Sequence, residues 1–201
     1  MSGHLTSSAH EDLAHTKYRA DIDGLRAVAV LSVVGFHAFP AWIRGGFVGV
    51  DVFFVISGFL ISTILLGSLD GGVFTFREFY VRRVVRIFPA LVTVLVFCFA
   101  LGWFTLYADE YKQLGKHMAA GAGFLSNFIY WQEAGYFDKA TELKPLLHLW
   151  SLGIEEQFYF VWPLALYLVF IGLKRRGGLL LLILFLTTAS FVHNVTHIKA
   201  D

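Results

Sequence analysis

The chain has 201 residues, of which 57% are apolar and 15% are charged, and 21 of them are phenylalanine. This composition is far more apolar than that of a soluble domain, so it predicts an integral membrane protein. The formal net charge of +1, with arginines in short runs beside apolar stretches, argues against a nucleic-acid-binding protein, which would cover one face with positive charge.

Residues 1–17 are predicted to form a polar tail, and residues 18–201 a membrane domain. The tail lacks the apolar core of a secretory signal peptide. It contains His4, His10 and His15, but their spacings of six and five residues do not repeat on one face of a helix. We therefore predict a solvated tail and no metal site.

Five apolar stretches are long enough to cross a membrane, because about 20 apolar residues span the hydrocarbon core. The predicted fold is an all-α polytopic bundle with about five spans, at residues 25–43, 46–66, 87–107, 152–173 and 179–195. Residues 118–131 are apolar, but the segment is short and contains glycine, serine and asparagine. We interpret it as re-entrant or interfacial, within a long external connection over residues 108–149.

Positive charges next to the spans predict the orientation. The loops after the second and fourth spans are rich in lysine and arginine, and the positive-inside rule places both in the cytoplasm. With five spans the N-terminus lies there as well. The sequence predicts a multi-pass protein of the inner (cytoplasmic) membrane, surrounded by membrane lipids, whose loop charges are Arg77, Arg82, Arg83, Arg86, Lys174, Arg175 and Arg176.

Away from the membrane surface, the first two spans contain His37 and Asp51, and an ionisable residue at such a depth is costly and is a functional hypothesis by default. His37 follows Arg26 at a distance of about 16 Å along a helix. It is either a functional residue or a buried histidine bonded to a backbone carbonyl near Pro40, and both interpretations stay open. Asp51 could pair with His37 and leave its second ring nitrogen as a general base, or it could only anchor a helix end.

Two further groups of polar residues stand out. Arg83 and Arg86 are spaced i, i+3, so on a helix they share a face suited to phosphate, unless they only set topology. Glu155 and Glu156 fall a turn inside an apolar helix. One could be a cap partner at the helix start, but at least one is predicted to face a polar cavity that holds His148 or His37.

Several segments together resemble the N-terminal part of the membrane acyltransferase 3 family, bacterial O-acyltransferases that modify surface glycans such as O-antigen or peptidoglycan. The similarity covers residues 18–163, in order and with compatible spacing, so it is more specific than any single motif. The segments are "YRADIDGLRAVAVLSVVGFHAF", "GGFVGVDVFFVISGFLI", "FYVRRVVRIFPAL", "LSNFIYWQEAGYFD" and "LLHLWSLGIEEQFYFVWP".

The resemblance implies transfer of an acyl group, usually acetyl from cytoplasmic acetyl-CoA, to a carbohydrate hydroxyl. It implies that Arg26, Arg83 and Arg86 bind the acyl-CoA and that His37 is the base. The other predicted site residues would orient the acceptor or stabilise the cation on His37, namely His148, Glu155, Glu156 and, with less family support, Asp51.

The family usually has about ten helices, and some members carry a C-terminal SGNH-type esterase-like domain. With about half of these helices, the chain is interpreted as a truncated N-terminal part of the acyltransferase domain.

Two other functions remain as alternatives. A proton-coupled transporter also uses intramembrane His, Asp and Glu, but it would not need an arginine pair for phosphate. A non-catalytic membrane sensor or assembly subunit would leave the polar residues unexplained.

Overall fold

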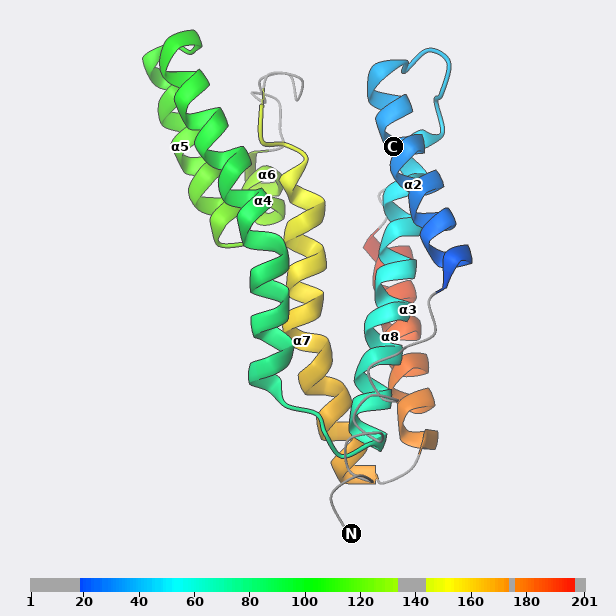
Figure 1. Ribbon diagram of the computed structural model, residues 1–201. Helices are drawn as coiled ribbons and strands as arrows, with labels where there is room; N and C mark the ends of the chain where they lie inside the picture. Colours follow the sequence, from blue (N-terminus) through cyan, green and yellow to red (C-terminus); the bar gives the residue numbers. More distant parts are fainter. Residues whose placement is uncertain (1–18, 134–143, 174–175, 198–201) are drawn as a thin grey trace. The chain divides into compact units, whose positions relative to one another are not determined.

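A computed structural model describes residues 19–133, 144–173 and 176–197. Over these ranges the chain is helical and has no strand, which confirms the predicted all-α fold. The elements are α2 (Ala20–Ala38), the 3-10 turn η1 (Gly46–Val48), α3 (Gly49–Asp70), α4 (Phe76–Thr105), α5 (Ala108–Ala122), α6 (Ser126–Glu133), α7 (Leu149–Leu173) and α8 (Arg176–His197) (Figure 1). The predicted tail and the loop residues Lys174 and Arg175 lie outside the described residues.

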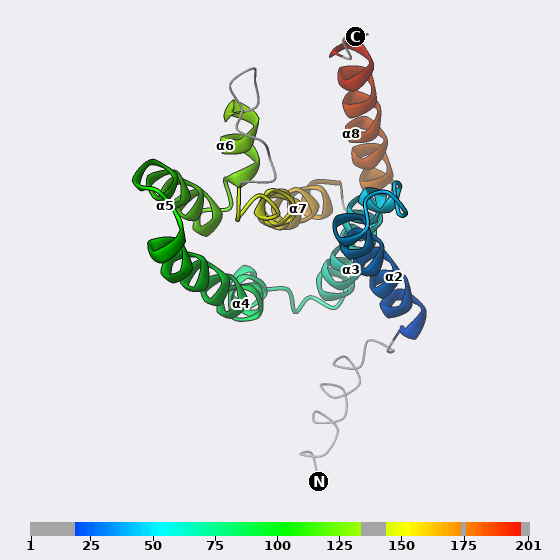
Figure 2. The same ribbon diagram turned by 90° about the horizontal axis from the view of Figure 1, so that it is seen from above.

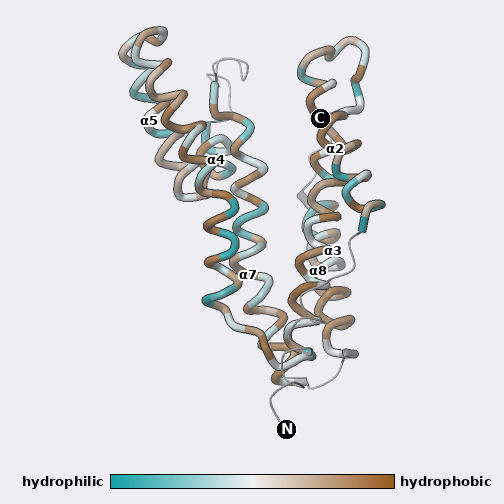
Figure 3. Tube along the Cα trace, in the orientation of Figure 1, coloured by the Kyte–Doolittle hydropathy of each residue, from teal (hydrophilic) through white to brown (hydrophobic). Residues whose placement is uncertain are grey.

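Four of the described helices are long and apolar enough to cross a membrane. They are Gly46–Asp70, Phe76–Thr105, Leu149–Gly172 and Gly178–Thr196, and they match the last four predicted spans. Figure 3 shows this hydrophobic character along the tube, broken by hydrophilic positions near the start of α4.

The first predicted span differs from the helix that forms there. Helix α2 carries Asp21, Asp23 and Arg26 in its first two turns and ends at Ala38. Its apolar part after Arg26 is about 18 Å long at 1.5 Å per residue, shorter than the hydrocarbon core of about 30 Å. By length and composition α2 is therefore not among the candidate spans.

The third predicted span also begins elsewhere, because α4 starts at Phe76 rather than at residue 87. The arginines predicted in a loop therefore lie in the first turns of a 30-residue helix that continues through Pro89. Arginine and valine do not interrupt a helix, and no glycine or proline stands between Thr75 and Pro89.

The predicted external connection contains two helices. Helix α5 ends at Ala122 and α6 begins at Ser126, and between them Phe124 has a φ of 56°, in the left-handed region. Residues 118–131 are therefore not one continuous helix, and neither half is long enough to cross a membrane. This break agrees with the interpretation as a re-entrant or interfacial segment.

The chain divides into two compact units, Met1–Leu60 and Ile61–Asp201. In the first, α2 packs closely against η1 and the start of α3. A Cβ on Gly46 would lie 2.2 Å from the Ser32 carbonyl oxygen, and one on Gly49 would lie 2.3 Å from the Ala29 carbonyl oxygen. Only glycine permits this approach of the two backbones.

The second unit has two apolar cores. One joins α3, α4 and α7 through Ile61, Leu65, Leu69, Phe79, Tyr159 and Leu166. The other joins α4 and α5 to the turn before α7 through Leu91, Leu95, Leu114 and Leu146. Seen from above, α4, α5, α6 and α7 follow one another around this unit (Figure 2). These cores fix the relation of α4 to α7, between which the candidate site lies.

Candidate functional site

A cavity of about 330 Å³ lies between α4, α7 and the turn that joins α5 to α6. This volume is at the lower end of the range for small-molecule sites. Its walls are mainly apolar, from residues such as Ile87, Phe88 and Phe160, and its polar groups come from Tyr80, Arg83, Glu156, Gln157 and Tyr159. The cavity therefore combines apolar walls with a cation and a carboxylate.

Arg83 projects from the first part of α4 to this cavity. Its guanidinium carbon lies 4.3 Å from the centroid of the Tyr159 ring and 5.8 Å from that of Phe79. Both distances allow cation–π attraction, which is strongest where water is excluded. Arg86 is exposed and does not line the cavity, so the predicted arginine pair presents only one member to it.

The adjacent glutamates have different surroundings. Glu155 accepts a hydrogen bond from the Tyr159 hydroxyl. Glu156 lines the cavity, as does Arg83. Its Oε1 is buried and has no hydrogen-bond partner among the described residues. Of the two glutamates, Glu156 is therefore the one that lines this cavity, and its part in the reaction stays a prediction.

His148, one of the two histidines considered for a polar cavity with a glutamate, does not line this one. The residue is exposed and directly precedes α7, where its carbonyl accepts a hydrogen bond from the Ser151 hydroxyl at 3.2 Å. His148 is separated from Glu156 by about 12 Å along the helix. The role predicted for His148 stays a prediction, since His148 was only one of the two histidines considered for such a cavity.

An amide pair joins α7 to the turn before α6. The Gln157 amide nitrogen donates to the Phe124 carbonyl at 2.7 Å and to Asn127 Oδ1 at 2.9 Å. One turn earlier, a Cβ on Gly153 would lie 3.2 Å from each of these two oxygens. The pair therefore holds the Phe124 backbone in the cavity wall. In the sequence, the one signal for this contact is Gly153, a residue without a side chain one turn before Gln157.

His37 lies in the other unit, at the end of α2. Its Nδ1 is 2.8 Å from the Val33 carbonyl oxygen, one turn earlier. Because a carbonyl only accepts, Nδ1 donates, and Nε2 is the basic nitrogen of the neutral ring. The ring is exposed and edges onto Phe36, so His37 is not the buried histidine bonded near Pro40 that was one of the open interpretations.

The expected pair of His37 and Asp51 does not form. Among the described side chains, no hydrogen bond or ion pair joins the two. The η1 turn places Asp51 in the first turn of α3, where it is exposed and where the helix dipole favours a carboxylate. This geometry fits the alternative in which Asp51 anchors a helix end. The His37 ring is oriented by the Val33 carbonyl and not by Asp51.

Arg26 and His37 lie on the same face of α2, because their separation along the chain is close to a whole number of helical turns. The Arg26 guanidinium is half-buried, 3.8 Å from the Asp23 carboxylate and 5.5 Å from the centroid of the Phe53 ring. Helix α2 therefore presents a cation near its start and a basic nitrogen near its end, both on one face.

The profile of a family described as the acyltransferase domain matches residues 19–200. The chain belongs to this acyltransferase family. This confirms the resemblance drawn from the sequence motifs. Within the family domain, the Arg-x-x-Arg segment supplies Arg83, and the segment from His148 to Gln157 supplies Glu156 and the glutamine of the amide pair.

Curated relatives of the chain include the putative peptidoglycan O-acetyltransferase YrhL of Bacillus subtilis (strain 168), which is 40% identical over 181 residues. The peptidoglycan O-acetyltransferase OatA of Listeria monocytogenes (serovar 1/2a) is 40% identical over 167 residues. These stretches are 89% and 82% of this chain but only 28% and 26% of the relatives, so the chain spans about a quarter of their length. No solved structure matches it.

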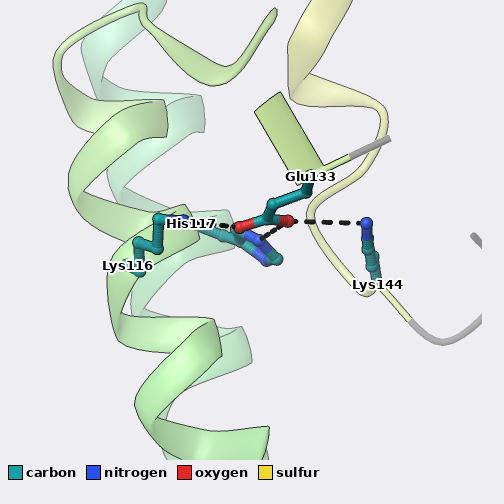
Figure 4. A network of polar contacts seen from close by, with 4 residues as sticks. All are labelled: Lys116, His117, Glu133 and Lys144. Atoms are coloured by element: carbon teal, nitrogen blue, oxygen red, sulfur yellow. Dashed lines mark hydrogen bonds and ion pairs between the residues drawn. The ribbon is translucent and has the colours of Figure 1, made fainter. Parts of the chain in front are cut away.

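A second polar cluster in the chain lies outside the cavity, around Glu133 of α6 (Figure 4). Lys116 Nζ donates to Glu133 Oε1 at 2.7 Å. On the other oxygen, Oε2, His117 Nε2 lies at 2.9 Å and Lys144 Nζ at 3.4 Å. His117 and Lys144 are almost fully buried. Sequence reasoning missed this cluster, since its members come from three separate segments of the chain and share no motif.

The cluster changes the titration of its carboxylate. Burial by itself would raise the pKa of Glu133, but hydrogen bonds from Lys116 and His117 and their charges outweigh it and lower the pKa to about 2. Because the pKa is lowered, the stabilisation is fully present above the ordinary value of 4.5 and is lost as the pH falls toward about 2.

Glu133→Gln is expected to destabilise the protein by about 3 kcal/mol, because it leaves the buried Lys144 without this counter-charge. The measurement is the midpoint of thermal unfolding in detergent at neutral pH. Glu78→Gln is the matched control, since Glu78 forms an exposed ion pair with Arg82 at 3.5 Å and its change should shift the midpoint little. Equal shifts for both variants would contradict a stabilising role for the cluster.

Proposed function

We propose that this chain forms part of a membrane O-acetyltransferase that moves an acetyl group from acetyl-CoA to a hydroxyl of a surface glycan. Family membership and the name of OatA support the reaction type and favour peptidoglycan as the first acceptor to test. The main support for the proposal is the cavity, because its apolar walls lie beside the cation of Arg83, which is held over Tyr159. A donor with a neutral acyl arm and an anionic head matches that combination.

In the proposed reaction, His37 Nε2 takes the proton of the acceptor hydroxyl while the hydroxyl oxygen attacks the thioester carbonyl carbon. The new C–O bond forms, the C–S bond breaks, and the proton passes to the departing CoA sulfur. The Val33 carbonyl holds the tautomer that makes Nε2 the base. Arg26, on the same face of α2, is proposed to contact the donor's anionic groups.

The proposed orientation places the donor and the acceptor on opposite sides of the membrane. The arginines at the start of α4 would face the cytoplasm, together with the N-terminus, and the region of α5 and α6 would face outward. A donor made in the cytoplasm then reaches the arginines, and a surface glycan approaches from outside. The protein would accordingly lie in the cytoplasmic membrane.

The direct test supplies labelled acetyl-CoA and peptidoglycan to membranes that contain the protein. We expect acetyl esters to appear on the glycan, in proportion to the protein present and above membranes that lack it. Proton-driven uptake of a solute without any acetyl ester would support the transporter alternative instead and would overturn the proposal.

Arg83→Ala is expected to raise the KM for acetyl-CoA at least about tenfold, since a charged contact in the cavity is lost, whereas Arg86→Ala should raise it less, because Arg86 does not line the cavity. Arg83→Lys should not restore it, because an ammonium lacks the planar stacking surface over Tyr159. Arg82→Ala is the matched control, as Arg82 is exposed and pairs with Glu78. If all variants keep the KM of the wild type, the arginines only set topology.

A further inference from the structure

Tyr159 contacts two of the predicted site residues at once. Its side chain is buried, with 5% of its surface exposed, and lies on the side of α7 that meets α4. The face of its ring lies under the guanidinium of Arg83, at 4.3 Å. Its hydroxyl donates a hydrogen bond to Glu155. One aromatic side chain therefore joins a cation of α4 to a carboxylate of the preceding turn of α7.

These two contacts strengthen each other. A phenol that donates to a carboxylate gains electron density on its ring, and that density attracts the cation over the ring face. The ring cannot swing away, because it is packed in the core with Ile61, Leu65 and Leu166. The long Arg83 side chain, which would otherwise sample many rotamers, is thereby held at the cavity.

The arrangement also gives the adjacent glutamates different roles. Glu155 is engaged by Tyr159, whereas Glu156 faces the cavity with a buried oxygen that no described residue bonds. The two carboxylates are thus not equivalent, although the sequence places them side by side.

We propose that Tyr159 is a positioning residue of the acetyl transfer, which holds Arg83 ready for the anionic part of the donor and fixes Glu155 in one rotamer. This inference rests on the proposed function for its kinetic consequence. Its structural content, a coupling of Arg83 to Tyr159, does not depend on the reaction. A tyrosine that served only the apolar core would need neither the hydroxyl contact nor the cation.

The kinetic test compares Tyr159→Phe, which keeps the ring, with Tyr159→Leu, which removes it. We expect KM for acetyl-CoA to rise about threefold in the first and about tenfold or more in the second, with smaller changes in kcat. Tyr111→Phe is the matched control, because its hydroxyl donates to the Phe99 carbonyl at 3.4 Å and does not touch the cavity. A purely structural Tyr159 would lower the amount of folded enzyme and leave KM unchanged, which would overturn the inference.

A second measurement separates this inference from the proposed function. The midpoints of thermal unfolding of Arg83→Ala, Tyr159→Leu and the double variant, without substrate, form a double-mutant cycle. We expect the double variant to lose clearly less than the sum of the single losses, because both single changes remove the same contact. Additive losses would overturn the coupling even if acetyl transfer is found. Absence of transfer by the wild type, with a non-additive cycle, would overturn only the proposed function.

Discussion

His37→Ala is expected to reduce acetyl transfer by about a hundredfold or more, the range typical for loss of a general base. The side chain is exposed and its Nδ1 bonds within its own helix, to Val33, so its removal should leave insertion and expression near normal. The measurement is the rate of acetyl-ester formation on peptidoglycan at saturating acetyl-CoA, with the amount of protein in the membrane determined in parallel.

The choice of variants makes this result specific. His37→Gln keeps a polar side chain of similar length but has no basic nitrogen, so it should be as inactive as the alanine variant. His193→Ala is the matched control, since His193 is also a histidine within an apolar helix but lies in α8. If His37→Ala keeps most of its activity, the histidine is not the base, and its bond to Val33 has only a local structural role.

Some parts of the fold can be predicted from the sequence and others cannot, depending on whether hydropathy alone determines them. The last four spans follow from continuous apolar runs, because burial of such runs in lipid is a property of composition. The start of α4 cannot be predicted in this way, since hydropathy indicates where a helix enters the bilayer and not where the helix begins. The helix extends back from the predicted start to Phe76, and this extension carries Arg83 and Arg86.

The site was less predictable, because it depends on the rotation of each helix about its own axis. Helix α7 is apolar on nearly all sides, so periodicity does not indicate that Tyr159 faces Arg83, which lies far earlier in the chain. The sequence did suggest that a glutamate of α7 faces a cavity, because a carboxylate in an apolar helix has few other places to lie, and Glu156 lines one. A pair of His37 and Asp51 was one of two alternatives for Asp51, and its place in the first turn of α3 fits the other, a helix anchor.

The orientation of the chain in the membrane can be tested by thiol labelling, in which each position is expected to be either labelled or fully protected. Single cysteines at positions 24, 73 and 112, in a Cys98→Ala background, can be tested with an impermeant thiol reagent on intact cells. Gly24 has open space at its Cβ position, and Val73 and Lys112 are exposed, so all three substitutions should be tolerated. We expect labelling at Lys112→Cys and none at Gly24→Cys and Val73→Cys until the membrane is permeabilised.

Gly24→Cys is the decisive position, because α2 carries three charges and a short apolar part. If α2 crosses the membrane, Arg26 lies on the cytoplasmic side and His37 toward the outer side, which the proposed reaction requires. If Gly24→Cys is labelled on intact cells while Val73→Cys is protected, α2 does not cross, and both ends of its polar face lie outside. Arg26 could then not meet a donor from the cytoplasm, and its assignment to acetyl-CoA would have to be withdrawn, whereas that of Arg83 would stand.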